Sequence, residues 1–165
     1  MHYEVLDEKR QALLPALGRF KEDFYLAGGT ALALQIGHRV SVDFDFFTEK
    51  DFETEDVYEQ VQEMFGQVPR TQESHRTLAV VVQEDVKVSF MGYRYPLIEA
   101  CTDTEHLRLA SILDIGCMKL VLKALVSFED VPTEPVDFIE GNKVTFAKIQ
   151  ETIIKSVKSV PLGIR

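Results

Sequence analysis

Two aspartates, Asp43 and Asp45, lie in an otherwise apolar run of this sequence, "VSVDFDFF" (residues 40–47). If this run is a strand, residues two apart point to the same face, so the two carboxylates project together. Two like charges side by side are unfavourable unless something cationic lies between them. Mg²⁺ prefers oxygen ligands and is held by one or two carboxylates together with phosphate oxygens. The pair therefore predicts a site for Mg²⁺ or Mn²⁺.

A glycine pair, Gly28-Gly29, precedes the aspartates and is followed by Thr30. At the start of a helix, such a pair lets a ligand approach the backbone closely and offers unpaired N–H groups at the positive end of the helix dipole. A phosphate chain could rest there, with the Thr30 hydroxyl as a further donor. One short helix and one turn, residues 31–42, link the glycines to the aspartates, so we expect the two motifs to be adjacent in space.

Each motif alone has a simpler explanation. Glycine pairs commonly form turns or helix caps, and an Asp-x-Asp at a strand edge commonly faces solvent because carboxylates are seldom buried. A purely structural role for both motifs therefore stays open. A dinucleotide-binding Rossmann domain is disfavoured, because the glycines do not form a G-x-G-x-x-G turn.

Together, the motifs resemble those of a known superfamily. The segment "GGTALALQIGHRVSVDFDFF" (28–47) is similar to the first motif of the DNA polymerase β-like nucleotidyltransferases: a small-residue pair, a short helix and an Asp-x-Asp. Within it, "GHRVS", with Arg39 and Ser41, resembles the AbiEii/AbiGii-type nucleotidyltransferases, which are often the toxin of a bacterial toxin–antitoxin pair. "DIGCMKL" (114–120) resembles the family helix that carries a lysine, here Lys119, and "LVSFEDVPTEP" (125–135) resembles a C-terminal segment.

The resemblance implies transfer of a nucleoside monophosphate from a nucleoside triphosphate to an acceptor hydroxyl of RNA, protein or a small molecule. It implies that Asp43 and Asp45 are the catalytic metal ligands. It further implies that the nucleotide is bound by Gly28, Gly29, Thr30, Arg39, Ser41 and Lys119. For Arg39, an ion pair that orients the Asp-x-Asp segment is an equal alternative. A cognate antitoxin is an implied partner.

Two departures from the superfamily pattern favour an alternative function. A third carboxylate usually lies on a neighbouring strand, whereas the matching position here is Ser89, which is a poor base at pH 7. Asp85 is near it in the sequence but lies in a predicted turn. The helical half that follows Lys119 is also shorter than in family members. The alternative is a nucleotide-binding or partner-binding remnant of the same fold without turnover.

The elements that must position these residues can be predicted from periodicity and turn signals. We expect strands over residues 24–27, 40–47, 75–83 and 86–93. We expect helices over residues 7–20, 31–37, 49–66, 112–128 and 145–160, with a loop over 128–144 before the last helix. This order predicts an α/β (α+β) fold in one domain, 1–165, with a small mixed β-sheet flanked by helices, as in nucleotidyltransferases.

Composition excludes several classes of protein. The chain has 165 residues, 45% of them hydrophobic and 27% charged, which is ordinary for one globular domain. Its formal net charge of −9 argues against general nucleic-acid binding. Cys101 and Cys117 show no CxxC spacing and are expected to be reduced thiols. Because neither a signal peptide nor an apolar run of ~20 residues is present, we expect a cytoplasmic protein without membrane association.

Overall fold

The computed structural model describes the backbone of residues 1–125 and the side chains of residues 1–118. The predicted loop 128–144 and the predicted helix 145–160 lie outside the described residues, and the assignment of 1–165 to one domain stays a prediction. The helices are α1 (Glu8–Leu17), α2 (Gly28–Ile36), α3 (Thr54–Phe65) and α4 (Ile112–Leu125), with short 3-10 helices η1 (Tyr3–Val5) and η2 (Gly18–Phe20). The strands are β1 (Tyr25–Ala27), β2 (Phe44–Thr48), β3 (Arg70–Ser74), β4 (Thr77–Val82), β5 (Val86–Gly92), β6 (Thr102–Asp103) and β7 (Arg108–Leu109).

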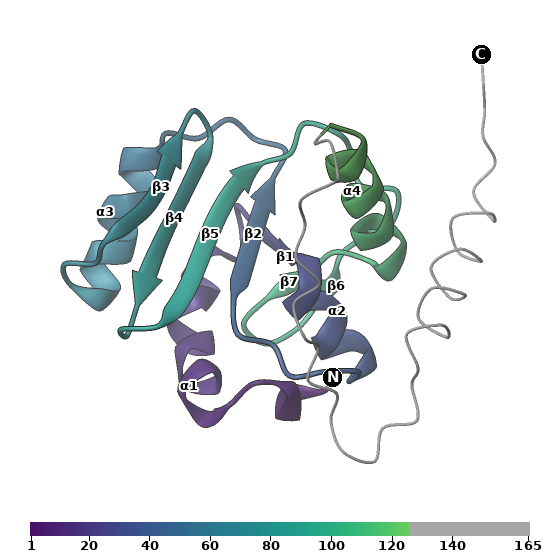
Figure 1. Ribbon diagram of the computed structural model, residues 1–165, viewed down its shortest axis with the longest axis horizontal. Helices are drawn as coiled ribbons and strands as arrows, with labels where there is room; N and C mark the ends of the chain where they lie inside the picture. Colours follow the sequence, from purple (N-terminus) through teal and green to yellow (C-terminus); the bar gives the residue numbers. More distant parts are fainter. Residues whose placement is uncertain (126–165) are drawn as a thin grey trace.

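The seven strands form one mixed sheet in the order β3-β4-β5-β2-β1-β7-β6. Strand β2 runs parallel to β5 and antiparallel to β1, which is itself parallel to β7. Helix α3 lies behind the β3–β4 end of the sheet, and α2 and α4 lie at the other end, beside β1 and β7 (Figure 1). The predicted mixed sheet with flanking helices is confirmed.

A cluster of phenylalanines packs on the face of the sheet opposite Asp45. Phe44 and Phe46 of β2 are almost fully buried, as is Phe90 of β5. The rings of Phe46 and Phe90 stack with centroids 5.4 Å apart, and Phe20 packs on Phe90 at 4.6 Å. Since neighbouring side chains on a strand point to opposite faces, these buried phenylalanines leave Asp45 on the other face.

The strand predicted from Val40 begins only at Phe44, so the prediction was wrong for its first four residues. Residues 40–43 are not in a strand, because their backbone groups have other partners than a ladder. The carbonyls of residues 40, 42 and 43 accept hydrogen bonds from the side chains of Arg39, Arg10 and Thr30. The Ser41 N–H donates to the Val5 carbonyl, at 2.9 Å. Asp43 therefore lies before β2. The alternation of side chains along a strand applies only to Asp45, which it puts on the face opposite Phe44 and Phe46.

Other boundaries also differ. The strand expected from residue 75 begins at Thr77, because residues 75–76 form the turn of a β3–β4 hairpin that was not predicted. Helix α1 ends at Leu17 and continues as 3-10 helix η2, and the acidic helix begins at Thr54. Ser111 caps α4, since its Oγ accepts the Asp114 N–H at 3.0 Å and donates to Asp114 Oδ2 at 2.7 Å. Among the described residues, no helix has both the length and the apolarity required to cross a membrane.

Candidate functional site

The glycine turn and Asp45 are in contact. Strand β1 pairs with β2 so that Ala27 lies opposite Asp45, and α2 begins at the next residue, Gly28. Gly28 has a φ of 70°, which disfavours any residue with a side chain. A Cβ placed on Gly28 would lie 3.0 Å from Asp45 Oδ2. The expected adjacency of the two motifs is confirmed, and the Asp45 carboxylate faces the N-terminus of α2.

The environment of Asp45 disfavours a negative charge there. Burial raises the pKa of Asp45 above its ordinary value, and the charge of Asp43 raises it further. A hydrogen bond from Ser89 and the charge of Lys87 oppose this shift of the pKa. A cation bound in front of the two carboxylates would offset both their repulsion and the cost of burial.

Ser89 occupies the place expected of a third carboxylate. It lies directly opposite Asp45 in the parallel β2–β5 register and is buried. Its hydroxyl bonds to Asp45, which lowers the pKa of that carboxyl. The described residues contain no group of three or more His, Cys, Asp or Glu that could hold a metal ion. Within the described part of the chain, Asp43 and Asp45 are therefore the two candidate carboxylate ligands, without a third beside them.

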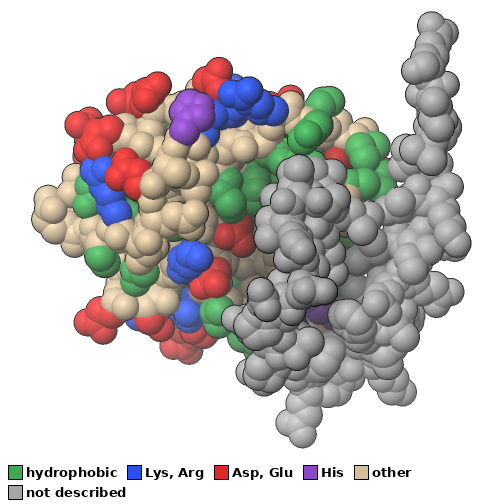
Figure 2. Space-filling model, turned by 45° about the horizontal axis from the view of Figure 1, so that its top comes forward, with side chains coloured by type: hydrophobic (Ala, Val, Ile, Leu, Met, Phe, Trp, Pro, Cys, Tyr) green, Lys and Arg blue, Asp and Glu red, His purple; other side chains and the backbone are tan. Residues whose placement is uncertain are grey.

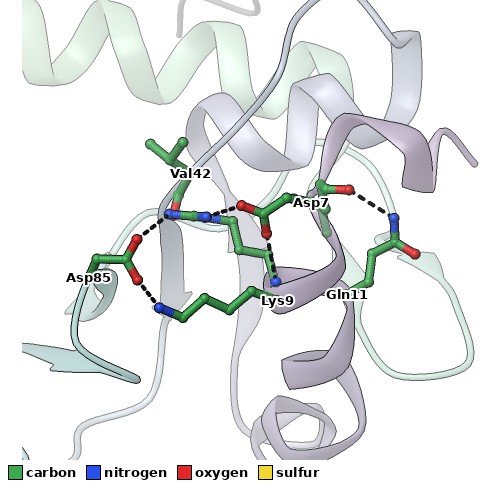
Figure 3. A network of polar contacts seen from close by, with 7 residues as sticks. Asp7, Lys9, Gln11, Val42 and Asp85 are labelled. Carbon is green, nitrogen blue, oxygen red and sulfur yellow. Dashed lines mark hydrogen bonds and ion pairs between the residues drawn. The ribbon is translucent and has the colours of Figure 1, made fainter.

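Asp85 does not fill the missing place, because its carboxylate is directed to α1. It forms ion pairs with Lys9 and, at 3.7 Å, with Arg10 (Figure 3). The hydrogen bond from Lys9 lowers the pKa of Asp85, so this group is a poor proton acceptor at neutral pH. Asp85 thus joins the β4–β5 turn to the N-terminal helix.

Arg10 holds the segment that enters the site. Its side chain is buried, and its Nε–H donates to the Val42 carbonyl at 2.7 Å, next to Asp43 (Figure 3). The same guanidinium contacts Asp7, the N-cap of α1. Sequence reasoning missed this residue, although Arg10 shares the buried face of α1 with Leu13, Leu14 and Leu17 at helical spacing. A charged residue on an apolar helix face was the available signal.

Thr30 and Ser41 are buried, and their hydroxyls contact each other at 2.6 Å. The Thr30 hydroxyl also donates to the Asp43 carbonyl. The two side chains therefore fix the backbone at Asp43 from inside the fold. Their direct contact with phosphate stays a prediction.

Arg39 lies over the glycine turn. A Cβ built on Gly29 would collide with the Arg39 guanidinium, which also donates from Nη1 to the Val40 carbonyl at 3.0 Å. No ion pair between Arg39 and Asp43 or Asp45 occurs among the described side chains. The positive charge of Arg39 is thus placed beside the α2 N-terminus, where an anion would bind. Lys119 lies on α4, and its side chain is outside the described set.

Surface charge on the face seen in Figure 2 is mixed. On this face, acidic side chains are spread around the described part of the molecule with Lys and Arg between them. No broad basic surface is visible among the described residues of this face.

Residues 12–149 match a sequence profile of the family described as nucleotidyl transferase AbiEii toxin, type IV toxin–antitoxin system. The chain belongs to the AbiEii nucleotidyltransferase toxin family. This AbiEii-family chain is 42% identical over 120 residues to a protein of Aquifex aeolicus (strain VF5) named only as uncharacterized protein aq_aa25. That match covers 69% of the chain and 57% of the relative, so the chain spans just over half of the relative's length.

Two solved structures show some likeness to the AbiEii-family chain. JHP933 from Helicobacter pylori superposes with a TM-score of 0.47 and 18% identity, covering 72% of this chain and 54% of its own. The apo form I of a CCA-adding enzyme superposes with a TM-score of 0.45 and 18% identity, covering 56% and 22%.

Proposed function

We propose that this chain is a metal-dependent nucleotidyltransferase that moves a nucleoside monophosphate from a nucleoside triphosphate to an acceptor hydroxyl. The observation that carries the proposal is the close approach of the Asp45 carboxylate to Gly28 at the N-terminus of α2, where a Cβ on Gly28 would lie 3.0 Å from Asp45 Oδ2. This geometry supports a site in which a carboxylate that would bind metal lies next to a turn that would bind phosphate. Family membership supports the same reaction class.

The donor set fits Mg²⁺ or Mn²⁺. Asp43 and Asp45 supply hard oxygen ligands, and the raised pKa of Asp45 reflects a half-buried carboxylate that a cation would stabilise in its charged form. When bound, the metal neutralises phosphate charge and polarises the phosphoryl group. The chain's own residues position the substrate: the α2 N-terminal amides and Arg39 face the phosphates. Thr30, Ser41 and Arg10 hold Asp43 in place.

Ser89 does not preclude turnover in this proposal. Phosphoryl transfer passes through a loose transition state, so catalysis consists mainly of positioning and charge neutralisation. A strong base is therefore less important than the metal and the phosphate cradle. The acceptor hydroxyl belongs to RNA, to a protein or to a small molecule, and we propose that the chain acts in the cytoplasm as a toxin controlled by a cognate antitoxin.

The second candidate function is nucleotide or partner binding without turnover. The observation that favours it is the neutral Ser89 opposite Asp45, where a third carboxylate would stand. In this case the glycine turn and the aspartates bind a metal–nucleotide complex, and the binding itself is what the partner recognises.

Incubation with labelled nucleoside triphosphates, Mg²⁺ and total RNA separates the two functions. The proposed transferase incorporates label, and Asp43→Asn and Asp45→Asn abolish the incorporation. Asp56→Asn, which changes an exposed acid on α3, is the matched control and retains it. Nucleotide binding with no incorporation into RNA, protein or small hydroxylated acceptors would favour the binding function instead.

A further inference from the structure

Three aromatic rings continue from the strand of Asp45 to the surface. Phe47 lies two residues beyond Asp45 on the same face of β2, roughly 7 Å further along the strand. Tyr93 packs edge-on against Phe47, with centroids 6.3 Å apart, and Tyr95 packs on Tyr93 at 5.4 Å. Tyr95 is 57% exposed, whereas Phe47 is buried. We call Phe47, Tyr93 and Tyr95 the aromatic ledge.

The sheet holds the inner end of this ledge rigidly. The Tyr93 N–H donates to the Thr48 carbonyl at 2.8 Å, which fixes Tyr93 at the end of β5. Tyr25 of β1 stacks against Phe47 from the other side, with centroids 6.3 Å apart and ring planes 21° apart. Since aromatic side chains have only two rotatable bonds, little entropy is lost when a ligand packs on such a surface.

The position of the ledge relative to the phosphate cradle suggests its ligand. Gly28, the first residue of α2, lies close to Asp45. Residue order along β2 places Phe47 and the ledge on the side of Asp45 that leads away from Asp43. A nucleoside triphosphate with its phosphates at Gly28 and Asp45 has its sugar and base still to place. Planar bases stack on exposed aromatic rings.

We propose that the aromatic ledge is the base-binding part of the nucleotide site, with the base of the nucleoside triphosphate stacked on Tyr95. This inference rests on the proposed function, because it takes the phosphates to lie at the glycine turn. Stacking accepts every base, since each has a π face, so the ledge binds purine and pyrimidine nucleotides with limited discrimination.

Removal of the Tyr95 ring is the test, with the full chain, Mg²⁺ and two ligands, a nucleoside triphosphate and inorganic tripolyphosphate. Tyr95→Ala should weaken nucleoside triphosphate binding by roughly tenfold, as the loss of one stacked base does. Binding of tripolyphosphate, which has no base, should be unchanged. Tyr95→Phe keeps the ring and should bind both ligands as the unaltered chain does. Because Tyr95 is exposed, thermal unfolding should be the same in all three proteins.

Equal affinity of Tyr95→Ala and the unaltered chain for the nucleoside triphosphate would overturn the inference. If tripolyphosphate still binds in that case, the phosphate cradle stands and only the ledge fails. If the unaltered chain binds neither ligand, the proposed function fails together with the inference. Weaker binding of a short oligonucleotide by Tyr95→Ala, with unchanged nucleoside triphosphate binding, would assign the ledge to an acceptor and would also overturn the inference.

Discussion

Asp45 lies so close to Gly28 that a methyl group on Gly28 would lie 3.0 Å from Asp45 Oδ2. This close approach couples the carboxylate that would bind metal to the backbone that would bind phosphate. A side chain at position 28 would displace the Asp45 carboxylate. Substitutions at Gly28 and at Asp45 therefore both test this relationship.

Gly28→Ala should damage both stability and binding. The positive φ at Gly28 strains any other residue by about 1–3 kcal/mol, and the added methyl group would displace the Asp45 carboxylate. Urea unfolding and tripolyphosphate binding would measure the two effects. Gly66→Ala is the matched control, because Gly66 has a φ of 74° but no atom within 4 Å of its Cβ position. It should lose stability alone, and equal binding by both variants would contradict the role of the contact.

Asp45→Asn should make the metal-free protein more stable at neutral pH while it abolishes nucleotide transfer. Burial raises the pKa of Asp45, which means that the charged carboxylate costs stability in the fold. Its removal should raise the free energy of unfolding by on the order of 1 kcal/mol, as substitutions at functional sites often do. Chemical denaturation at pH 7 without metal checks this, and a lower stability of Asp45→Asn would show that its charge is already compensated.

The stability of the metal-free protein should fall as the pH rises through the pKa of Asp45. Because this carboxyl has a higher pKa in the folded than in the unfolded chain, the folded state binds the proton more tightly between those two values. The stabilising proton is lost above the folded pKa. Asp45→Asn has no titrating group at this position. The difference in unfolding free energy between the two proteins at each pH therefore gives the contribution of the Asp45 carboxyl.

Mn²⁺ binding should weaken as the pH falls, because protons compete with the metal for Asp45. Since the pKa of Asp45 is raised, this loss should begin at a higher pH than it would for a site with ordinary aspartates. Ser89→Ala removes the hydrogen bond that lowers the Asp45 pKa, so the midpoint of the pH titration should move up. Lys87→Met removes a neighbouring positive charge and should move the midpoint in the same direction. Paramagnetic resonance of free Mn²⁺ follows the titration, and a downward shift in either variant would refute the assignment of the titration to Asp45.

Arg10→Met should lower transfer activity, because the Val42 carbonyl next to Asp43 loses its buried donor. Loss of this part-buried hydrogen bond should also cost about 0.5–1.5 kcal/mol of stability. Arg19→Met removes an exposed ion pair with Glu63 and should cost less than about 1 kcal/mol, with full activity. Amide hydrogen exchange at residues 41–43 would report the loosened segment directly, and unchanged exchange in Arg10→Met would argue against a positioning role.

Local signals in the sequence predicted that the glycine turn and Asp45 lie side by side. A short linker joins Gly28 to Asp45, so their adjacency followed from the motifs themselves, and the alternation along β2 correctly placed Phe44 and Phe46 in the core. The start of β2 could not be predicted, because apolar residues before Phe44 favour a strand locally. The carbonyl of Val42 is instead bound by Arg10, which is distant in sequence.

Non-local pairing also explains the missed strands. Strand β3 consists of polar, mostly exposed residues at a sheet edge, and β6 and β7 have two residues each. Such segments lack the hydrophobic pattern of a strand, and partner strands define them. The ion pair between Arg10 and Asp85 likewise joins residues that are distant in sequence, so local patterns do not predict it.

The register between β2 and β5 has a consequence for the evolution of this chain. Ser89 lies opposite Asp45 on a strand whose backbone is fixed by its ladder, so an acidic residue could stand there without any change in topology. The third carboxylate is one amino-acid exchange away. Under the proposed function, an exchange at this one position would change the transfer activity, while the rest of the molecule stays the same.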